Sequence, residues 1–333
     1  MTALPFPGPR QLEAILRLLE LLADGRFHSG EDLGAALGVG RGGVWRLMRS
    51  LAALGFEVHG VTGKGYRLAE SVDLLAEERI RAAMGPHDGP ALRQLDVLPS
   101  VDSTNRWLIG RAVSGGTAPA AVVSEHQSGG RGRRGRVWVS PFGQNLYLSL
   151  LWYFEDIAHA LPACSLAVAV AVARALRSMG AGDIGLKWPN DVYWRGRKLA
   201  GMLLELVGEA AGPYKVVIGV GVNVNMMAAD IDQPWTSLRM VTGQPWDRNR
   251  VAGRLLEEML AGVARFERQG MAACQADWDA LDLTRGRRVT LHLADGRVEG
   301  TALGTDGDGA LRIRTGQGVR HFHAGEVSLR VAP

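Results

Sequence analysis

Cysteine is scarce in this 333-residue sequence, which contains only Cys164 and Cys274. The two residues lie far apart, and neither has histidines nearby at metal-ligand spacing. A disulfide framework and a cysteine-based zinc site are therefore excluded. This cysteine usage is typical of a protein of the reducing cytoplasm, and cytoplasmic is the location that we expect.

Targeting and membrane-spanning segments are also lacking. The N-terminus has no basic segment followed by an apolar run, so no signal peptide is predicted. The most apolar stretch, residues 157–173, contains His159 and Pro162 and is too short to cross a bilayer. We interpret it as part of a buried helix and expect no membrane partner.

A strong excess of charge of one sign is absent as well, since the formal net charge is only +4. Any argument for nucleic-acid binding must therefore rest on where the charge lies. Hydrophobic residues make up 47% of the chain and charged residues 22%, an ordinary balance for a protein with a substantial core. The length is sufficient for two or three domains.

The N-terminal residues 10–70 show the pattern of a small helical module followed by a hairpin. Apolar positions recur at helical spacing in residues 11–22, and again in residues 41–54, where Val44, Leu47, Met48 and Leu51 form one face. Between them Ser29 caps a short helix that ends at Gly38. Two strands that flank Thr62-Gly-Lys64 then complete a winged helix-turn-helix.

Charge within this module indicates which side would meet DNA. Residues 41–67 carry five cations against one acid, whereas residues 10–34 carry three cations against five acids. The third helix and the hairpin are thus the basic face. The candidate DNA-binding residues are Ser29, Arg41, Trp45, Arg46, Arg49 and Lys64.

An alternative is a helix-turn-helix that only packs against protein. Gly42 and Gly43 favour it, because each glycine costs about 1 kcal/mol inside a helix. Two glycines at the start of a recognition helix would, however, also permit close approach to phosphates.

Residues 71–90 contain a predicted helix (73–84) and a proline-glycine break, which indicate a linker. Residues 91–283 then alternate strands and helices, and Trp194–Lys198 is typical of a tight hairpin turn. We therefore expect an α/β domain with a mixed, mostly antiparallel sheet. Residues 284–333 contain five short strand-like runs separated by glycine-rich turns, which predict an SH3-like β-barrel. The fold class as a whole is α+β.

The most unusual stretch is residues 129–136, in which every position is glycine or arginine. Glycine permits close backbone approach to a ligand, and the planar forks of arginine match phosphate and carboxylate oxygens. Four arginines in eight residues repel one another unless an anion lies between them. We interpret the stretch as an anion-binding loop that a polyphosphate would order, and call it the arginine loop.

Two other interpretations of this loop are possible. Gly130-x-Gly132-x-x-Gly135 matches the dinucleotide-binding fingerprint, but that fingerprint needs a helix directly after the last glycine. Val137–Pro141 follows instead and favours strand and turn. A disordered basic linker is disfavoured because strand-like segments flank the loop on both sides.

A second constellation lies further along the chain at Lys187–Asp191, Lys198–Gly201 and Gly219–Asn223. An Asn-Asp pair can ligate Mg²⁺ or hold a ribose or an amine, and it can equally form a turn. A lone lysine at a hairpin exit usually faces solvent. Beside the arginine loop and a glycine-rich strand end, however, Lys198 becomes a candidate for binding an anionic ligand.

These motifs, in this order, resemble the biotin–protein ligase family. The resemblance rests on Ser103–Asn105, Gly130–Arg136, Ser140–Gly143, Lys187–Asp191, Lys198–Gly201 and Gly219–Asn223, and it extends from Leu16 to Arg330. With its N-terminal module the chain is similar to the bifunctional biotin ligases and biotin operon repressors of bacteria.

The resemblance implies two half-reactions. The biotin carboxylate attacks the α-phosphorus of ATP, with Mg²⁺, to give biotinyl-5′-adenylate and pyrophosphate. A lysine of the biotin carboxyl carrier protein of acetyl-CoA carboxylase, or of another biotin-dependent enzyme, then attacks the mixed anhydride. The adenylate-loaded form would be a homodimer that binds operator DNA and represses biotin genes.

The resemblance also assigns residues. Biotin would be bound by Ser103, Thr104, Asn105, Gln127, Arg131, Gly132, Arg133, Lys198, Gly201 and Gly219. ATP and the adenylate would be bound by Arg131, Arg134, Arg136, Trp138, Asn190, Asp191, Asn223 and Trp235. Lys198 and Arg133 would be catalytic, and Asp191 is a weak candidate for binding Mg²⁺.

The DNA module departs from the family pattern, because Gly42, Gly43 and Trp45 are unusual in its third helix. One alternative is therefore a monofunctional ligase whose helix-turn-helix does not bind DNA. Another is a DNA-binding sensor of biotin or a nucleotide without ligase turnover. The complete arginine loop together with Lys198 argues against the sensor.

Overall fold

The computed structural model describes residues 6–70, 72–157, 160–208, 213–293, 296–323 and 328–331. The chain divides into two compact units. Unit 1 contains Met1–Leu74 and Pro141–Gly143, and unit 2 contains Leu75–Ser140 and Gln144–Pro333. Asp295 of a predicted turn and Val327 of a predicted strand lie outside the described residues.

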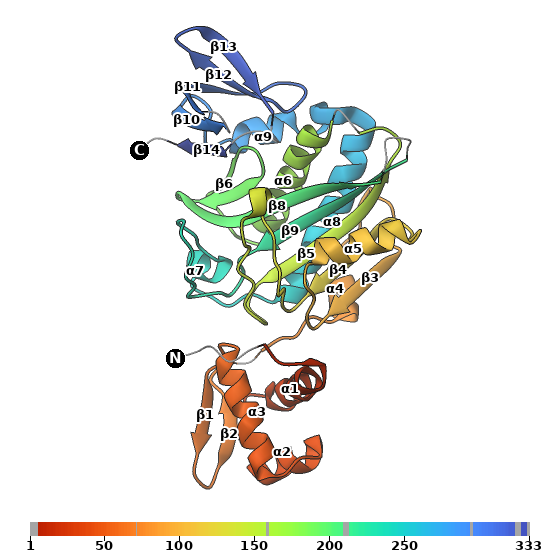
Figure 1. The fold of residues 1–333 in the computed structure, drawn as a ribbon, viewed down its shortest axis with the longest axis vertical. Coiled ribbons are helices and arrows are strands. Elements are labelled where there is room, and N and C mark those ends of the chain that lie inside the picture. Colours follow the sequence, from red (N-terminus) through yellow and green to blue (C-terminus); the bar gives the residue numbers. More distant parts are fainter. Residues whose placement is uncertain are drawn as a thin grey trace. The chain divides into compact units, whose positions relative to one another are not determined.

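The described residues of unit 1 form three helices and a two-stranded hairpin (Figure 1). These are α1 (Pro9–Leu22), α2 (Gly30–Leu37), α3 (Arg41–Ala53), β1 (Val58–Val61) and β2 (Gly65–Leu68). Ser29 caps α2 by accepting a hydrogen bond from the backbone N–H of Asp32 at 3.0 Å, and Gly38 ends the helix in the left-handed region. The predicted apolar face of the third helix is buried. The predicted helix-turn-helix is confirmed.

The turn between α2 and α3 explains one of the two unusual glycines. A Cβ atom at Gly43 would lie 2.8 Å from the Cβ of Val39, and one at Gly34 would lie 2.7 Å from the carbonyl oxygen of Val39. Both positions must therefore lack a side chain for the two helices to pack. A Cβ at Gly42, by contrast, would have its nearest neighbour 3.9 Å away.

The core of unit 1 is completed by a segment from much later in the chain. Phe142 is 1% exposed and packs edge-on against Phe56, with ring centroids 6.1 Å apart. A Cβ at Gly143 would lie 3.0 Å from the Phe56 ring. The three residues Pro141–Gly143 thus belong to the core of unit 1, although they follow the arginine loop in sequence.

Unit 2 is built on a seven-stranded sheet with the order β3-β4-β5-β9-β8-β7-β6. Only β3 and β4 pair in parallel, and the other neighbours are antiparallel, which confirms the mixed, mostly antiparallel sheet. The predicted turn after Trp194 places Arg195 and Gly196 at φ 45° and 78°. The strands are β3 (Gln94–Leu98), β4 (Ala120–Ser124), β5 (Leu146–Phe154), β6 (Ile184–Lys187), β7 (Asp191–Trp194), β8 (Arg197–Val207) and β9 (Tyr214–Val222).

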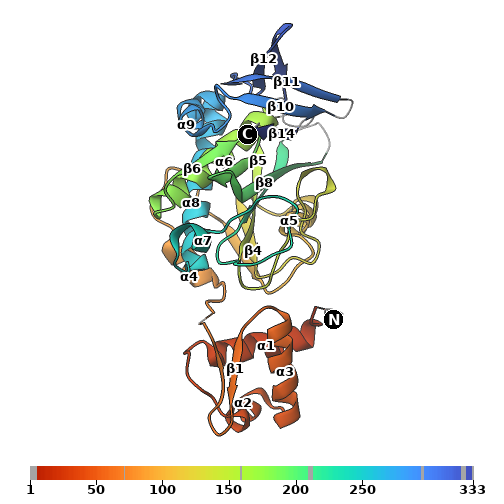
Figure 2. The same cartoon turned by 90° about the vertical axis from the view of Figure 1, so that its left-hand side faces the viewer.

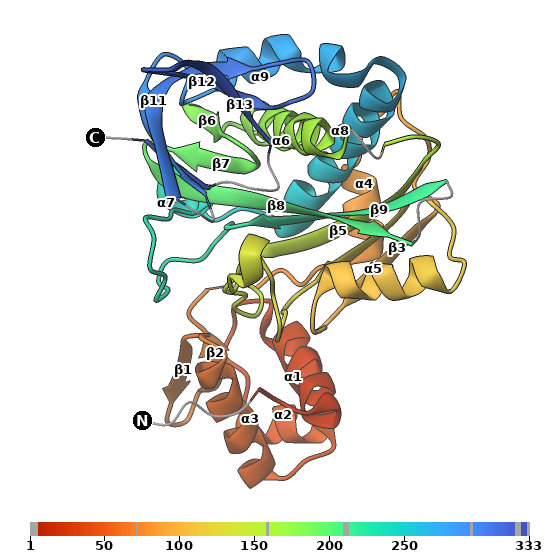
Figure 3. The ribbon, with the colours of Figure 1, turned by 45° about the horizontal axis from the view of Figure 1, so that its top comes forward.

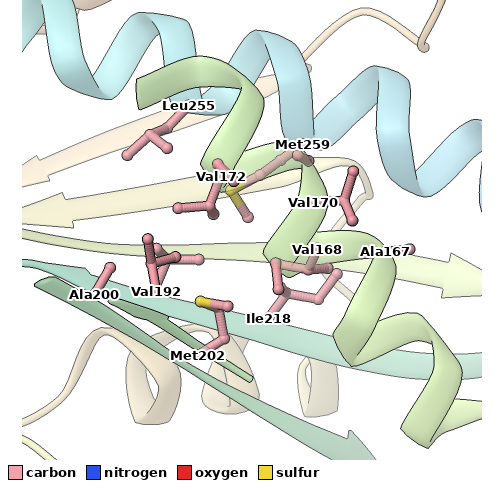
Figure 4. Packing of buried hydrophobic residues seen from close by; sticks show 14 of the residues in the cluster. Ala167, Val168, Val170, Val172, Val192, Ala200, Met202, Ile218, Leu255 and Met259 are labelled. Atoms are coloured by element: carbon pink, nitrogen blue, oxygen red, sulfur yellow. The ribbon is translucent and has the colours of Figure 1, made fainter. Parts of the chain in front are cut away.

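Helices cover the two faces of this sheet differently. On one face α6 (Leu161–Ser178) and α8 (Arg248–Gln269) form the main core, and on the other lies α5 (Thr104–Val113) (Figure 3). Figure 4 shows side chains of α6 and α8 packed onto those of β7, β8 and β9. The helix α6 is long and apolar enough to cross a membrane, but 72% of it is buried inside the structure, as expected for a core helix.

Three further α-helices lie in the part of unit 2 that the structure describes. The helix α4 (Glu77–Ala83) packs against α8 and is shorter than the predicted helix over 73–84. Two short helices, α7 (Leu238–Thr242) and α9 (Gln275–Leu281), were not predicted. Their five and seven residues are too few for a helical periodicity to be visible in the sequence.

The C-terminal strands form a second sheet, in which every pair is antiparallel (Figure 2). They are β10 (Arg288–Leu293), β11 (Gly296–Thr305), β12 (Leu311–Thr315), β13 (Gly318–Phe322) and β14 (Ser328–Val331). Their inward side chains, such as Leu291 and Ile313, join the hydrophobic core of unit 2.

Candidate functional site

A β-bulge turns Lys198 toward the α5 face of the large sheet. In the pairing of β7 with β8, Val192 faces Ala200 and Tyr193 faces Lys198, so that Leu199 is an extra residue. Side chains alternate along a strand, and the extra residue puts Lys198 on the same face as Gly201 instead of the opposite one. A Cβ at Gly201 would indeed lie 3.2 Å from the Lys198 Nζ atom.

Three glycines on this face make room for functional side chains. A Cβ at Gly219 would lie 2.2 Å from the Asn105 Oδ1 atom, and one at Gly221 would lie 2.5 Å from the Trp138 ring. Gly201 and Gly221 are paired directly across β8 and β9. Because these glycines lack side chains, the side chains of Lys198, Asn105 and Trp138 pack directly against the backbone of β8 and β9. We call these three glycines the cavity floor.

Above the floor lies a cavity of about 780 Å³. Nearly all residues predicted to bind biotin or ATP line it. They are Ser103, Thr104, Asn105, Gln127, Arg131, Gly132, Arg133, Arg134, Arg136, Trp138, Asn190, Asp191, Lys198, Gly201 and Gly219. The described lining includes neither Asn223 nor Trp235.

A hydrogen-bond network fixes one end of the cavity. The Gln127 Oε1 atom accepts from the Thr104 N–H at 2.9 Å and from its hydroxyl at 3.0 Å. The Ser149 Oγ atom lies 2.8 Å from the Thr104 hydroxyl and 2.6 Å from Asn105 Oδ1. The Asn105 amide group then donates to the Leu203 carbonyl at 3.2 Å and to Glu205 Oε2 at 2.6 Å. Both donor hydrogens of Asn105 are therefore engaged within the protein.

The arginine loop folds back over the cavity as a closed turn. Gly132 N–H donates to the Arg136 carbonyl at 2.7 Å, and Trp138 N–H donates to the Gly130 carbonyl at 3.0 Å. Only one 3₁₀ turn, Arg133–Gly135, occurs within the loop, and extended backbone follows. Because no helix follows the last glycine, the dinucleotide fingerprint does not apply.

Cations and carboxylates meet inside the cavity, whose lining includes Asp191 and Asp232. Lys198 Nζ lies 2.9 Å from Asp191 Oδ1, with side chains 14% and 22% exposed, and 5.6 Å from the centroid of the Trp138 ring. Burial lowers the pKa of the Arg133 guanidinium, and the carboxylate of Asp191 opposes that shift. Lys198 and Arg133 are partly buried, and the exposed arginines of the loop add further positive charge, so the cavity is suited to binding an anion.

Two of the predicted ATP-binding residues, Asn190 and Asn223, are engaged in structural hydrogen bonds, and a third, Trp235, lies in a β-bridge. The side-chain amide of Asn190 donates to the Met202 carbonyl, and that of Asn223 donates to the Thr236 carbonyl at 3.0 Å. The backbone of Trp235 forms a bridge beside Lys198. These residues brace the strands next to Lys198.

The described residues do not form a metal site of their own, since they contain no group of three or more His, Cys, Asp or Glu side chains suited to a metal ion. Asp191 is a single carboxylate, and its oxygen is paired with Lys198. The protein residues thus do not fit a resident Mg²⁺ ion, and Mg²⁺ would arrive with a nucleotide as substrate.

In unit 1 the predicted DNA-binding residues differ in exposure. Arg41, Trp45, Arg46, Arg49 and Lys64 are all exposed. Trp45 is 52% exposed and carries the Arg49 guanidinium over its ring, 5.1 Å from the centroid. The Ser29 hydroxyl is instead occupied with Asp32 at the start of α2.

Sequence reasoning missed Ser149 and Glu205, which hold Asn105 from two sides. Neither belongs to a recognisable motif. The alternation of side chains along β8 could have identified Glu205, because Glu205 follows Gly201 and Leu203 on the same face of the strand.

Family models match three parts of the chain. Residues 12–67 match a model described as HTH domain, residues 97–223 match the biotin/lipoate A/B protein ligase family, and residues 284–330 match the biotin protein ligase C terminal domain.

Curated relatives extend the likeness to almost the whole chain. The Bifunctional ligase/repressor BirA of Escherichia coli (strain K12) is 40% identical over 95% of this chain and 97% of its own length. The Biotin--[acetyl-CoA-carboxylase] ligase of Mycobacterium tuberculosis is 39% identical over 72% of this chain and 90% of its own length. Among solved structures, the biotin protein ligase from Aquifex aeolicus in complex with biotin and ATP is 30% identical, with a TM-score of 0.64, and covers 72% of this chain and 100% of that chain.

Proposed function

Since the chain belongs to the biotin protein ligase family of the bifunctional ligase/repressor type, we propose that it activates biotin with ATP and transfers it to a protein lysine, and that it binds DNA through its helix-turn-helix. The observation that carries the ligase half is the placement of Lys198 and the arginine loop around one cavity. The near full-length match to ligase/repressors supports the DNA-binding half.

The first half-reaction joins two anions, the biotin carboxylate and the α-phosphate of ATP. The carboxylate oxygen forms a bond to the α-phosphorus while the bond to pyrophosphate breaks, which yields biotinyl-5′-adenylate. Lys198 and the loop arginines neutralise the negative charge of the carboxylate and the phosphates. Their stabilising effect is largest in the transition state, where this negative charge is most concentrated. In the second half-reaction a lysine amine of a biotin carboxyl carrier protein attacks the acyl carbon, AMP leaves, and the amine releases its proton.

We assign to biotin the end of the cavity that the hydrogen-bond network of Thr104, Gln127 and Asn105 fixes. Ser103, Thr104 and Gln127 would meet its ureido group, while Gly201 and Gly219 lie beneath it. Because both donors of Asn105 are already engaged, we assign that residue to shaping the pocket. Arg131, Gly132 and Arg133 would close over the ligand from the arginine loop.

We assign the end near Lys198 to the nucleotide. Lys198 would bridge the biotin carboxylate and the α-phosphate, and Arg133, Arg134 and Arg136 would meet the phosphates. Trp138, Asn190, Asp191, Asn223 and Trp235 remain proposed contributors to this end. A stacking contact of an aromatic residue with adenine would contribute about 1–3 kcal/mol, by analogy with base stacking.

We extend the proposal to assembly and location. The β1–β2 hairpin would act as a wing with Lys64 at its turn, and the C-terminal strands would form an SH3-like barrel. The adenylate-loaded protein would dimerise on operator DNA, and the acceptor would be the carrier protein of acetyl-CoA carboxylase or of a related enzyme. All of these partners belong to the cytoplasm, where we place the protein.

Biotin transfer to a purified carrier domain tests the ligase half. We expect Lys198→Ala to slow adenylate formation about tenfold or more, because a buried cation is lost from the transition state. Arg177→Ala, which removes an exposed cation from the end of α6, serves as the control and should leave the rate unchanged. Equal pyrophosphate exchange in both variants would refute the role of Lys198.

Capture of genomic fragments tests the repressor half. Purified protein is mixed with fragmented genomic DNA, with and without biotin and MgATP. Enrichment of one palindromic site only with both ligands supports an adenylate-dependent repressor. Absence of enrichment in either condition, with the carrier still biotinylated, would indicate a monofunctional ligase whose helix-turn-helix does not bind DNA.

A further inference from the structure

Glu205 of β8 receives hydrogen bonds from two residues of the cavity without lining the cavity itself. Its Oε2 atom accepts from Asn105 Nδ2 at 2.6 Å. One guanidinium nitrogen of Arg131 lies 3.2 Å from Oε1 and 3.4 Å from Oε2. Asn105 and Arg131 both line the cavity, whereas the described lining does not include Glu205.

The position of Glu205 follows from the register of the sheet. Gly201, Leu203 and Glu205 alternate along β8 and share the α5 face. Leu203 pairs with Gly219, whose missing side chain makes room for Asn105. Glu205 follows Leu203 by two residues, and its carboxylate accepts a hydrogen bond from the NH₂ group of Asn105. From there it also reaches Arg131, near the start of the arginine loop.

We propose that Glu205 is a positioning residue for biotin, which acts by orienting the Asn105 amide and by holding Arg131 over the biotin end of the cavity. This inference rests on the proposed ligase function and adds a residue to its site. The carboxylate fixes which way the amide points, because only the NH₂ side of Asn105 can donate to it. Ser149 secures the opposite side by bonding to Oδ1.

A surface ion pair without functional effect is the ordinary alternative, and the geometry argues against it. Exposed pairs such as Arg81–Glu77, with side chains 37% and 49% exposed, contribute little. The Glu205 side chain is 24% exposed and bonds to a residue that is 4% exposed. Removing an acceptor from a buried amide leaves a donor without a partner, which costs more than the loss of an exposed pair.

Two substitutions separate the contacts of Glu205. Glu205→Gln keeps the length and a carbonyl oxygen that can accept from Asn105, but it cannot neutralise Arg131. Glu205→Ala removes both contacts. We expect the KM for biotin in pyrophosphate exchange to rise about threefold in the first variant and about tenfold or more in the second, with the KM for MgATP and kcat changed by less than about threefold.

Glu77→Gln is the matched control, because it removes a carboxylate from another Glu–Arg pair of unit 2. It should leave all three constants unchanged. If Glu205→Ala leaves the KM for biotin within about twofold of the wild type, or if kcat falls while that KM stays constant, the positioning role is refuted. A lower KM for biotin in Glu205→Gln would show that Glu205 competes with the substrate anion for Arg131, which also overturns the proposal.

A double-mutant cycle tests whether Glu205 acts through Arg131. We expect Arg131→Met and the double variant Arg131→Met/Glu205→Gln to have the same KM for biotin within about twofold. Effects that multiply would mean that the two residues act independently and would refute the proposed route. Direct calorimetric titration with biotin repeats the comparison without turnover, so that an inactive wild-type enzyme would count against the ligase function and not against Glu205.

Discussion

The cavity of unit 2 and the outer face of α3 in unit 1 both present cations to an anion, but they do so in opposite ways. In the cavity, Lys198 is 14% exposed and already paired with Asp191. On α3, the side chain of Arg41 is 86% exposed, and its contact with Glu31 is a loose one at 3.5 Å. Lys198 is thus held in place before a ligand arrives, whereas Arg41 is free to adapt.

This difference matches what each surface would have to do. Stabilising a transition state requires charges that do not reorganise, and buried, hydrogen-bonded side chains provide this. Binding a phosphate backbone depends mainly on the release of counterions, which exposed and mobile cations achieve. A substitution in the cavity floor should therefore have a large and specific effect, whereas one on α3 should have a small and salt-dependent effect.

The largest effect is expected from Gly219→Ala. The added Cβ would lie 2.2 Å from Asn105 Oδ1, so that Asn105 must move and its bonds to Ser149 and Glu205 must break. Because a shift of about 1 Å in a site can cost about a hundredfold, we expect kcat/KM for biotin in adenylate formation to fall about tenfold to a hundredfold.

Gly110→Ala is the control for this prediction. Gly110 lies on α5, the same helix as Asn105, and a Cβ there would have no neighbour within 4 Å. Its activity should equal that of the wild type. If Gly219→Ala retains full activity, the cavity floor does not position Asn105 in the way described.

A smaller effect is expected on α3. Arg46 is exposed on this helix, and Arg46→Ala should weaken DNA binding several-fold and reduce the salt slope of the binding constant by about one if it meets a phosphate. Adenylate formation should not change. Arg17→Ala on α1, where two glutamates balance two arginines, removes another exposed arginine and should leave the slope unchanged. Identical slopes in the two variants would contradict the assignment of α3 as the DNA-binding face.

The same comparison shows what could be predicted from the sequence. Helical periodicity predicted the buried face of α3, since Val44, Leu47, Met48 and Leu51 are all in the core. Nearly all of the biotin- and ATP-binding residues that were predicted from the sequence line the cavity. Both are local properties of the chain, which a sequence displays directly.

Features that depend on how side chains and strands meet in three dimensions could not be predicted. The bulge at Leu199, which aims Lys198, depends on pairing with β7. Gly43 resembled an anion-binding glycine, but its reason is contact with Val39. Phe142 lies in a motif of the ligase part and yet packs in the core of unit 1. In each case the cause is a neighbour in space that the order of residues does not reveal.

The smallest effect concerns pH and tests whether the region beside the cavity excludes water. Burial lowers the pKa of His126 from 6.5 to about 4, and its Nδ1 atom lies 2.9 Å from the Ser100 hydroxyl. In the unfolded chain this histidine takes up a proton near pH 6.5, whereas in the folded state it stays neutral until about pH 4. The unfolding free energy of unit 2 should therefore decrease as the pH falls from 6.5 to 4.

His126→Gln should remove this part of the pH dependence. Comparing denaturant unfolding at about pH 7.5 and pH 5, we expect the wild type to lose roughly 1 kcal/mol more than the variant, after allowance for the partial exposure of the ring. His59→Gln, on the β1 strand of unit 1, is the control and should retain the loss seen in the wild type. An equal loss in His126→Gln and in the wild type would mean that water reaches His126, and the contrast between a dry cavity region and an exposed α3 would then be weaker than the structure indicates.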